Sequence, residues 1–246
     1  MSRVALVTGA GSGIAAEVAR GLAKAGHRLI LVDADAHALA AVAAELGEAA
    51  LADRPWVLDA RDARAVAEAF AALADRPDIL VNGVGGDARR IGVEDLDEDA
   101  FLESYRHNLL TSFSFIRHSV PAMKARGWGR IVNLASIAGR TYSVFSNAGY
   151  VAAKAAVIGL TKQCAFELAP HGITVNAVAH GPIGTERIDR AWAEKTPEQR
   201  AAILERIPAG RMGTVAEAAA AVLPFCAQYA GFTTGAVLDV NGGLHI

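Results

Sequence analysis

The stretch that decides the fold of this 246-residue chain stands at its start, where residues 4–14 read VALVTGAGSGI. A strand-like aliphatic run leads into a glycine-rich turn, and a helical pattern begins directly after the turn. Glycine lets a backbone approach a pyrophosphate closely, and the free N–H groups at a helix start favour its charge. We therefore expect a dinucleotide-binding turn. Its contact residues would be Gly9, Ser12, Gly13 and Ile14.

Short aliphatic runs alternate with longer Ala-rich stretches of helical period along the whole chain. The strand-like runs are Val4–Thr8, Arg28–Val32, Trp56–Leu58, Ile79–Val81, Arg130–Leu134, Thr174–Val178 and Val237–Val240. The helical stretches are Ile14–Ala25, Ala36–Leu46, Ala63–Leu73, Asp99–Arg126, Tyr150–Leu168 and Val215–Tyr229. This alternation predicts an α/β fold, a doubly wound parallel sheet with helices on both faces and a ligand crevice at the carboxyl ends of its strands.

No internal repeat, low-complexity linker or break in composition divides residues 1–246, so we expect a single domain. Residues 181–209 do not fit the alternation of strands and helices, because they are charged, carry three prolines and precede the last helix and strand. An insertion beside the crevice can act as a mobile lid over the substrate. The alternative interpretation is a pair of helices docked on the surface.

Composition limits the classes of function. The formal net charge is −2, so the chain has no basic surplus for nucleic acid. Because it has no charged start followed by an apolar stretch, and no run of about 18 apolar residues, we expect neither a signal peptide nor a membrane span. Cys164, Cys226 and the scattered histidines lack metal-ligand spacing, which indicates reduced thiols in a cytoplasmic protein without a metal site.

An acidic residue, Asp33, follows the glycine turn by about 20 residues, at the end of the second strand-like run. A carboxylate there accepts hydrogen bonds from the adenosine ribose and repels a 2′-phosphate. No Lys or Arg at positions 10–16 or 34–38 would attract that phosphate. The sequence therefore predicts NAD as the cofactor. Asp33 could instead cap the next helix, although Asp35 suits that role better.

Tyr150 and Lys154 stand four residues apart in a helical stretch, fourteen residues after Ser136. Positions i and i+4 share one face of a helix, so the phenol and the ammonium can point into the same cleft. The ammonium would lower the tyrosine pKa from about 10, as a general acid or base on an alcohol or ketone requires. Alone, this short pattern could be a chance pair. With the dinucleotide turn, it predicts redox chemistry at a carbonyl.

Over essentially its whole length, the chain resembles the short-chain dehydrogenase/reductase family in its compact, Rossmann-like form. The matching elements, in order, are Thr8-Gly9-x-x-x-Gly13, Asp59, Asn82, Asn108, Ser136, Tyr150-x-x-x-Lys154 and Asn176-x-Val178-x-x-Gly181-x-Ile183-x-Thr185. The resemblance implies that Ser136 orients the substrate oxygen and Tyr150 exchanges its proton. It also implies that Lys154 binds the nicotinamide ribose, and that Asn108 holds a water in a proton relay.

The same resemblance implies further cofactor contacts. Asp59 and the backbone of Ala60 would contact adenine, and Ile183 and Thr185 would hold the nicotinamide carboxamide. The strand-four motif that includes Asn82 and Gly83 would lie near the adenosine. Without the resemblance, Asn108 reads as a polar residue on a helix surface and Thr185 as a helix N-cap.

The chain departs from the family pattern at four places. Ala15 stands where a third glycine is usual, and the strand-four motif reads Asn82-Gly83-Val84-Gly85. The interval between Ser136 and Tyr150 is one residue longer than is common, which should bulge the substrate-side loop. His180 replaces a proline, and its ring is interpreted either as facing the substrate or as a substitution without a role.

We therefore expect an oxidoreductase that moves a hydride between NAD and a small secondary alcohol or its ketone. Arginines in segments 86–91 and 181–209, namely Arg89, Arg90, Arg187 and Arg190, hint at an anionic substrate. One rival is an NADPH-dependent β-ketoacyl-thioester reductase, which the ending Gly235-x-x-x-x-Val240-x-Gly242-Gly243 resembles. The other is a nucleotide-sensing binding module that has lost turnover.

The helical stretch Tyr150–Leu168 is apolar or small-sided around nearly its whole girth. Only one side of such a helix can meet the sheet, so the other side should bury against a second subunit. Asp99–Arg126 offers a similar surface, and the apolar carboxyl end could dock across a second axis. The family resemblance points the same way, and we expect a homotetramer.

Overall fold

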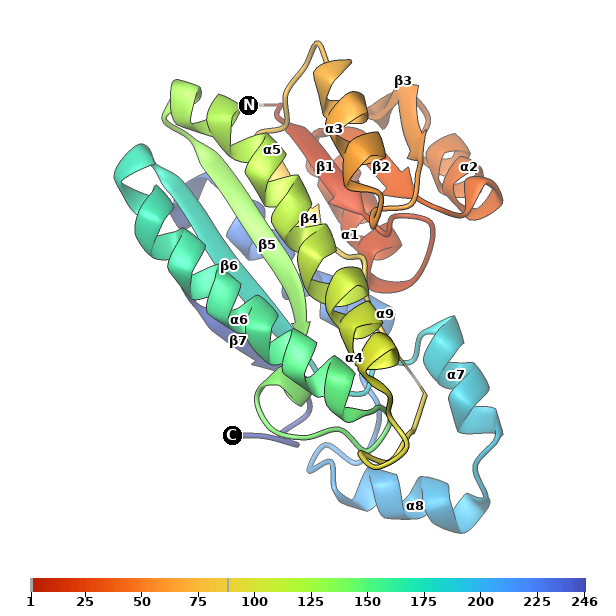
Figure 1. The fold of residues 1–246 in the computed structure, drawn as a ribbon. Helices are drawn as coiled ribbons and strands as arrows, with labels where there is room; N and C mark the ends of the chain where they lie inside the picture. Colours follow the sequence, from red (N-terminus) through yellow and green to blue (C-terminus); the bar gives the residue numbers. More distant parts are fainter. Residues whose placement is uncertain (1, 88) are drawn as a thin grey trace.

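The computed structural model describes residues 2–87 and 89–246, without the side chains of residues 51–54, 187 and 191. A parallel seven-stranded sheet in the order β3-β2-β1-β4-β5-β6-β7 forms its centre (Figure 1). The strands are β1 (Val4–Thr8), β2 (Arg28–Asp33), β3 (Ala50–Val57), β4 (Ile79–Asn82), β5 (Gly129–Ser136), β6 (Ile173–His180) and β7 (Val237–Val240). The predicted doubly wound fold is confirmed. Its strand order reverses between β1 and β4, which opens a crevice at their carboxyl ends.

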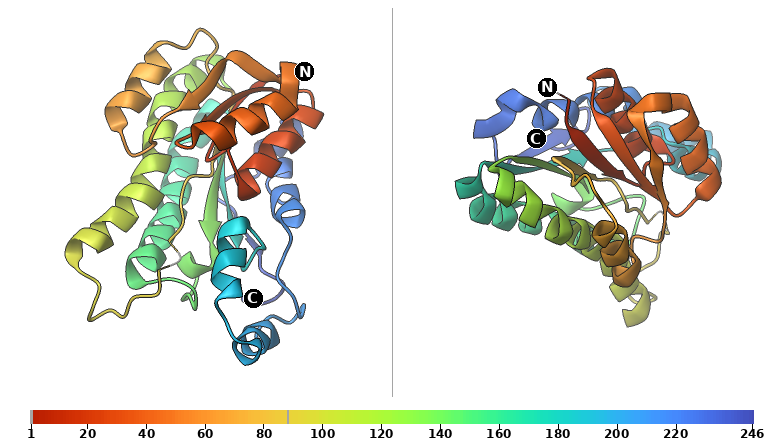
Figure 2. Two further views of the ribbon diagram at one scale, coloured as in Figure 1. Left: turned by 90° about the vertical axis from the view of Figure 1, so that its right-hand side faces the viewer. Right: turned by 90° about the horizontal axis from the view of Figure 1, so that it is seen from above.

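Helices cover both faces of the sheet, as the right-hand view of Figure 2 shows. They are α1 (Gly13–Lys24), α2 (Ala36–Leu46), α3 (Ala63–Ala71), α4 (Glu98–Tyr105), α5 (Thr111–Arg126), α6 (Ala148–Leu168), α7 (Glu186–Ala193), α8 (Pro197–Glu205), α9 (Val215–Ala220) and α10 (Leu223–Cys226). One core cluster joins the sheet to α1, α2, α9 and α10. A second joins it to α3, α5 and α6, and a smaller third packs α6 against β5 and β6.

Alternate residues of β1 show why the strands are aliphatic throughout. Ala5 and Val7 pack in the first cluster, whereas Val4 and Leu6 pack in the second. A strand buried on both faces has no solvent side, so it reads as a continuous apolar run. The central β1, β4, β5 and β6 are buried at almost every position.

Two of the predicted helices are wrong, because each is divided into shorter elements in the structure. The stretch expected as Asp99–Arg126 begins at Glu98 and is interrupted between α4 and α5 by a π-helical turn, η2 (Arg106–Leu110). The stretch expected as Val215–Tyr229 divides into α9, α10 and the 3₁₀ turn η5 (Gln228–Phe232). Pro224 stands at the start of α10. Proline lacks an N–H and clashes with a preceding helical turn, which accounts for that break.

Residues 181–209 form α7 and α8, which stand beyond the carboxyl ends of the strands (Figure 1). Thr185 caps α7 by accepting a hydrogen bond from the Ile188 N–H, and Thr196 forms a capping box with Gln199 at α8. The segment is joined to the body by a bridge between Ile183 and Gly213. It is thus a pair of short helices at the mouth of the crevice.

Candidate active site

A cavity of about 870 Å³ lies at the carboxyl ends of the strands, between the glycine turn and the α7–α8 segment. It brings together residues from across the chain. Those predicted for the site that line it are Gly9, Ser12, Gly13, Ile14, Asp33, Asp59, Ala60, Gly83, Asn108, Ser136, Tyr150, Lys154, Ile183 and Thr185. Asn82 does not line it.

Asn82 instead belongs to a buried chain of hydrogen bonds inside the sheet. Its Nδ2 donates to Asn133 Oδ1 at 2.8 Å, and Asn133 Nδ2 donates to Thr161 Oγ1 on α6 at 2.9 Å. This chain ties β4 and β5 to the helix that carries Tyr150. Asn82 therefore has a structural role inside the sheet, and Gly83, Val84 and Gly85 are the residues of this motif that line the cavity. A contact between Asn82 and the cofactor stays a prediction.

The glycine turn has the shape that a dinucleotide requires. Gly9 has φ +70°, and a Cβ there would lie 3.0 Å from the Gly83 carbonyl carbon. Gly13 has φ +57° and opens α1 toward the cavity. A side chain at either position would strain the turn or fill the cradle at the helix start, where backbone N–H groups favour a phosphate. These residues fit the phosphates of a nicotinamide dinucleotide.

Asp33 faces this turn. Its Oδ2 accepts a hydrogen bond from the Gly11 N–H at 2.9 Å, and its Oδ1 accepts one from the Asp35 N–H at 3.0 Å. Asp35 caps α2 through the His37 and Ala38 N–H groups. The helix-cap role thus belongs to Asp35, and the Asp33 carboxylate lines the cavity beside the glycine turn.

Lys154 and Tyr150 lie on one face of α6, as their spacing predicts. Lys154 is 4% exposed, and its ammonium donates to the Leu134 carbonyl at 2.8 Å and lies 5.9 Å from the centroid of the Tyr150 ring. Ser136 ends β5 beside them. Its Oγ accepts from the Ala138 N–H at 3.1 Å and lies 3.5 Å from the His180 carbonyl oxygen. A buried cation, a phenol and a hydroxyl therefore share one wall of the cavity.

Asn108 is fully buried, which excludes the surface interpretation. It stands in the π turn η2, where its Oδ1 accepts from the Gly86 N–H at 2.7 Å and its Nδ2 donates to the Ser104 carbonyl at 3.0 Å. A Cβ on Gly85 would lie 2.7 Å from Asn108 Oδ1 and 3.0 Å from Lys154 Nζ. Asn108 Oδ1 and Lys154 Nζ thus both approach Gly85 closely. Single π-helical turns inside α-helices occur frequently at functional sites.

The His180 ring turns toward α9. It is 5% exposed, and its Nε2 lies 3.2 Å from the Ala218 carbonyl oxygen. Burial lowers the pKa of His180 to about 4, so the ring is neutral near pH 7. The ring therefore packs against α9, and His180 also lines the cavity.

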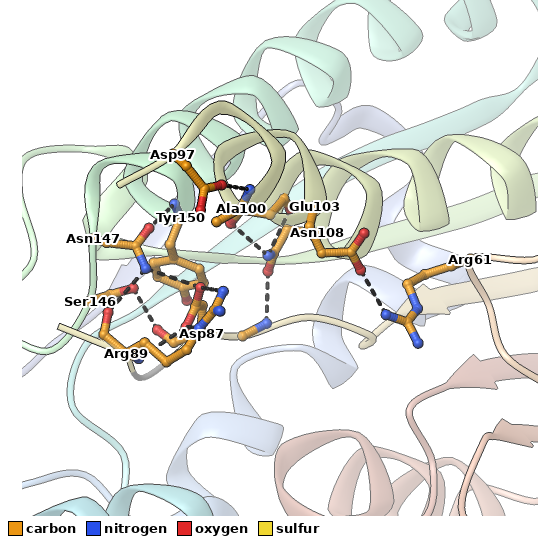
Figure 3. A network of polar contacts seen from close by, with 12 residues as sticks. Arg61, Asp87, Arg89, Asp97, Ala100, Glu103, Asn108, Ser146, Asn147 and Tyr150 are labelled. Carbon is orange, nitrogen blue, oxygen red and sulfur yellow. Dashed lines mark hydrogen bonds and ion pairs between the residues drawn. The ribbon is translucent and has the colours of Figure 1, made fainter. Parts of the chain in front are cut away.

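A polar network that the sequence did not predict precedes Tyr150 (Figure 3). Asn147 caps α6 by accepting from the Tyr150 N–H at 3.1 Å, and its Nδ2 donates to Asp87 Oδ2 and to the Arg89 carbonyl, both at 3.0 Å. Ser146 Oγ donates to the Asp87 carbonyl at 2.5 Å. Burial alone would raise the pKa of Asp87, but hydrogen bonds from Arg89 and Asn147 outweigh it and lower that pKa. An Asn before an apolar helix is a cap signal that could have been noticed.

Residues of this network and of the α7–α8 segment also line the cavity. Arg89, Arg190 and Arg206 line it, and Arg206 contacts the Tyr142 hydroxyl. Arg90 is exposed and does not line the cavity. The side chain of Arg187, which the sequence placed here, lies outside the described residues. In the part of the chain that the structure describes, no helix is long and apolar enough to cross a membrane.

Comparison with known proteins agrees with this geometry. The family model described as enoyl-(acyl carrier protein) reductase matches residues 9–245. The chain belongs to the short-chain dehydrogenase/reductase family. It is therefore an oxidoreductase of a family that acts on alcohol or ketone groups with a nicotinamide cofactor.

Individual relatives of this short-chain dehydrogenase/reductase differ in substrate. It is 42% identical to galactitol 2-dehydrogenase (L-tagatose-forming) of Cereibacter sphaeroides, over 97% of this chain and 93% of that protein. It is 36% identical to 2-dehydro-3-deoxy-L-rhamnonate dehydrogenase (NAD(+)) of a Sphingomonas species, over 98% and 94%. A crystal structure of 3-oxoacyl-[acyl-carrier protein] reductase with bound NAD from Brucella melitensis superposes with a TM-score of 0.87, 32% identity and coverage of 99% and 91%.

Proposed function

We propose that this protein is an NAD-dependent dehydrogenase of a secondary alcohol in a small polyol or sugar acid, and of the corresponding ketone. One observation carries the proposal: Asp33 lines the same cavity as Ser136, Tyr150 and Lys154. Two relatives named for a sugar alcohol and a sugar acid support the substrate class.

The residues divide the chemistry between them. Bound nicotinamide would supply the hydride acceptor. Tyr150 removes the proton of the substrate hydroxyl as a phenolate, and Ser136 orients that oxygen. Lys154, fixed by the Leu134 carbonyl, favours the phenolate because its charge is buried beside the ring. Asn108 completes the relay by which Tyr150 exchanges its proton with solvent.

Asp33 supports NAD over NADP. Its carboxylate is fixed by Gly11 and Asp35 at the adenosine end, where it would repel a 2′-phosphate. Among the Lys and Arg residues that line the cavity, Arg61 is the closest in sequence to Asp33. Its guanidinium is already paired with Asp59 and Glu103.

A second candidate is reduction of a β-ketoacyl thioester. The structural neighbour with bound NAD is named as a reductase of that class, and the ending Gly235–Gly243 resembles it. Arg89 and Arg190 at the mouth would then meet an acidic carrier.

Turnover decides between the candidates. The purified protein is given galactitol, a set of sugar acids and, in the reducing direction, a β-ketoacyl thioester, each with NAD(H) and with NADP(H). Formation or loss of reduced nicotinamide is followed by absorbance. We expect polyol or sugar-acid oxidation with NAD. Turnover confined to the thioester with NADPH would replace the first candidate by the second.

We also propose a homotetramer that works in the cytoplasm. Phe113 on α5 is 46% exposed and Phe166 on α6 is 80% exposed, so each helix keeps an apolar side away from the sheet. Leu238 on β7 and Ile246 at the carboxyl end are also exposed. The chain thus has two apolar faces, one on α5 and α6 and one on β7 and the carboxyl end. A tetramer built on two two-fold axes would bury both faces. The free thiols Cys164 and Cys226 suit a reducing compartment.

A further inference from the structure

Tyr150 stands in the first turn of α6, which begins at Ala148. The first N–H groups of a helix have no partner within the helix, so this turn depends on its cap and on contacts from outside the helix. Lys154 lies one turn further along and is fixed separately, because its ammonium donates to the Leu134 carbonyl. The alignment of the phenol with the ammonium therefore depends on what holds the start of α6.

Asn147 holds this start from two sides. Its Oδ1 accepts from the Tyr150 N–H at 3.1 Å, which caps the helix. Its Nδ2 donates to Asp87 Oδ2 and to the Arg89 carbonyl, both at 3.0 Å, in the loop after β4. Asn147 is 4% exposed and the Asp87 side chain is 8% exposed, so water competes little for these bonds. One buried amide thus joins the first turn of α6 to a loop 60 residues earlier in the chain.

The loop after β4 is itself held firmly. The Asp87 carboxylate accepts from Arg89 Nε at 3.0 Å and from Arg89 Nη2 at 2.8 Å, a bidentate geometry that restricts both side chains. One residue earlier, the Gly86 N–H donates to Asn108 Oδ1 in the π turn η2 at 2.7 Å (Figure 3). The loop is therefore held between Asn108 on one side and Asn147 on the other.

We propose that Asp87 and Asn147 are positioning residues for Tyr150, which act by holding the first turn of α6 in place. Misplacement of this turn would separate the phenol from the Lys154 ammonium and slow the proton transfer without disturbing the cofactor. Asp87 lines the cavity, but both of its carboxylate oxygens are engaged by Arg89 and Asn147. The inference rests on the proposed function only in that Tyr150 exchanges the substrate proton.

Steady-state kinetics of Asn147→Ser tests the inference. Serine keeps a side-chain oxygen for the helix cap but lacks the amide donor that reaches the loop after β4. We expect kcat to fall about tenfold, with KM and the dissociation constant for the reduced cofactor within about twofold of the parental values. In a Tyr150→Phe background the same change should not lower the residual rate further, because a residue that acts through the hydroxyl has no effect once the hydroxyl is gone.

Hydrogen exchange gives a second readout that needs no substrate. Asp87→Ala removes the carboxylate to which Asn147 Nδ2 donates, so we expect the amides in the first turn of α6 to exchange at least about threefold faster. Asp62→Ala is the matched control, because Asp62 caps α3 through the Arg64 and Ala65 N–H groups and does not line the cavity. This control should leave kcat and the exchange at α6 unchanged.

Parental kcat in Asn147→Ser, or parental exchange in Asp87→Ala, would overturn the inference. So would a further tenfold loss when Asn147→Ser is added to Tyr150→Phe, because the effect would then not pass through the hydroxyl. The kinetic measurement uses whichever substrate and cofactor the unmodified protein turns over. Turnover confined to the thioester with NADPH would therefore contradict the proposed function and leave this inference standing.

Discussion

Gly85 shows how single residues decide this site. It has φ +150°, and the space where its Cβ would stand is taken by Asn108 Oδ1 and Lys154 Nζ. Only glycine lets the loop after β4 pass this close to the Asn108 amide and the Lys154 ammonium. The chain has this glycine and Asn82 of the family's strand-four motif, whereas Gly83 and Val84 depart from the family pattern.

Gly85→Ala should therefore displace Lys154 or Asn108. We expect turnover per folded molecule to fall at least tenfold and the free energy of unfolding to fall by about 1–3 kcal/mol. Gly26→Ala is the control, since Gly26 has φ +83° with no atom within 4 Å of its added Cβ. That variant should lose stability and keep its turnover. Turnover is measured by steady-state kinetics. If Gly85→Ala kept the parental turnover, the account in which Asn108 and Lys154 depend on the space beside Gly85 would be wrong.

In the proposed function, Asp33 determines the preference for NAD(H) over NADP(H). Because its carboxylate would repel a 2′-phosphate, NAD(H) should bind at least about tenfold better than NADP(H), a difference of about 1.4 kcal/mol. Asp33→Ala should narrow this ratio, while Asp35→Ala, which removes only the α2 cap, should preserve it. Equal affinities of the unmodified protein for both cofactors, measured by titration, would refute the assignment.

At the scale of elements, β6 and α9 are coupled through His180. Burial lowers the pKa of this ring from 6.5 to about 4, and the ring contacts the Ala218 carbonyl. Below about pH 6.5 the unfolded chain binds a proton there that the folded chain does not. The stability that depends on the neutral ring is therefore complete above that pH, and falls as the pH decreases toward 4.

We expect the protein to lose about 2 kcal/mol more unfolding free energy than His180→Gln between about pH 7.5 and pH 5. Glutamine keeps an N–H donor for Ala218 and cannot titrate, so the difference isolates this ring. Urea denaturation at the two pH values measures it. Parallel losses in both proteins would show that His180 does not titrate in this range.

The elements themselves divide into those the sequence predicted and those it did not. Strands buried on both faces, such as β1, are aliphatic at every position, so their pattern is plain. Helix α6 was predicted to within two residues of its start. The π turn around Asn108 could not be predicted, because one added residue in a helix leaves no compositional trace. Pro224 was a visible signal for the break after α9.

At the scale of the whole molecule, the cavity gathers distant segments whose motifs could be recognised one by one. Fourteen of the fifteen predicted site residues line it, and Asn82 alone does not. An asparagine in the sheet and one in the crevice look alike in sequence, because only the fold decides which way the side chain points. The Arg61 bridge to Glu103 spans 42 residues, so no local pattern indicated it.

The exposed apolar faces predict the assembly. We expect light scattering at micromolar concentration to return about four times the 25.6 kDa mass of the chain. Phe166→Glu should weaken assembly through α6, since it places a charge on an 80% exposed apolar position. Val93→Glu is the control, because Val93 is 76% exposed and precedes α4, outside α5, α6, β7 and the carboxyl end. A mass near that of one chain for the unmodified protein would refute the tetramer.

The central claim is that Tyr150 transfers the substrate proton, and Tyr150→Phe tests it most directly. The substitution keeps the ring on α6 and removes only the titrating hydroxyl. With the best substrate of the turnover panel, we expect kcat to fall by about a factor of 10³ while the dissociation constant for NADH stays near the parental value. Retention of more than about a tenth of the parental kcat would contradict the claim.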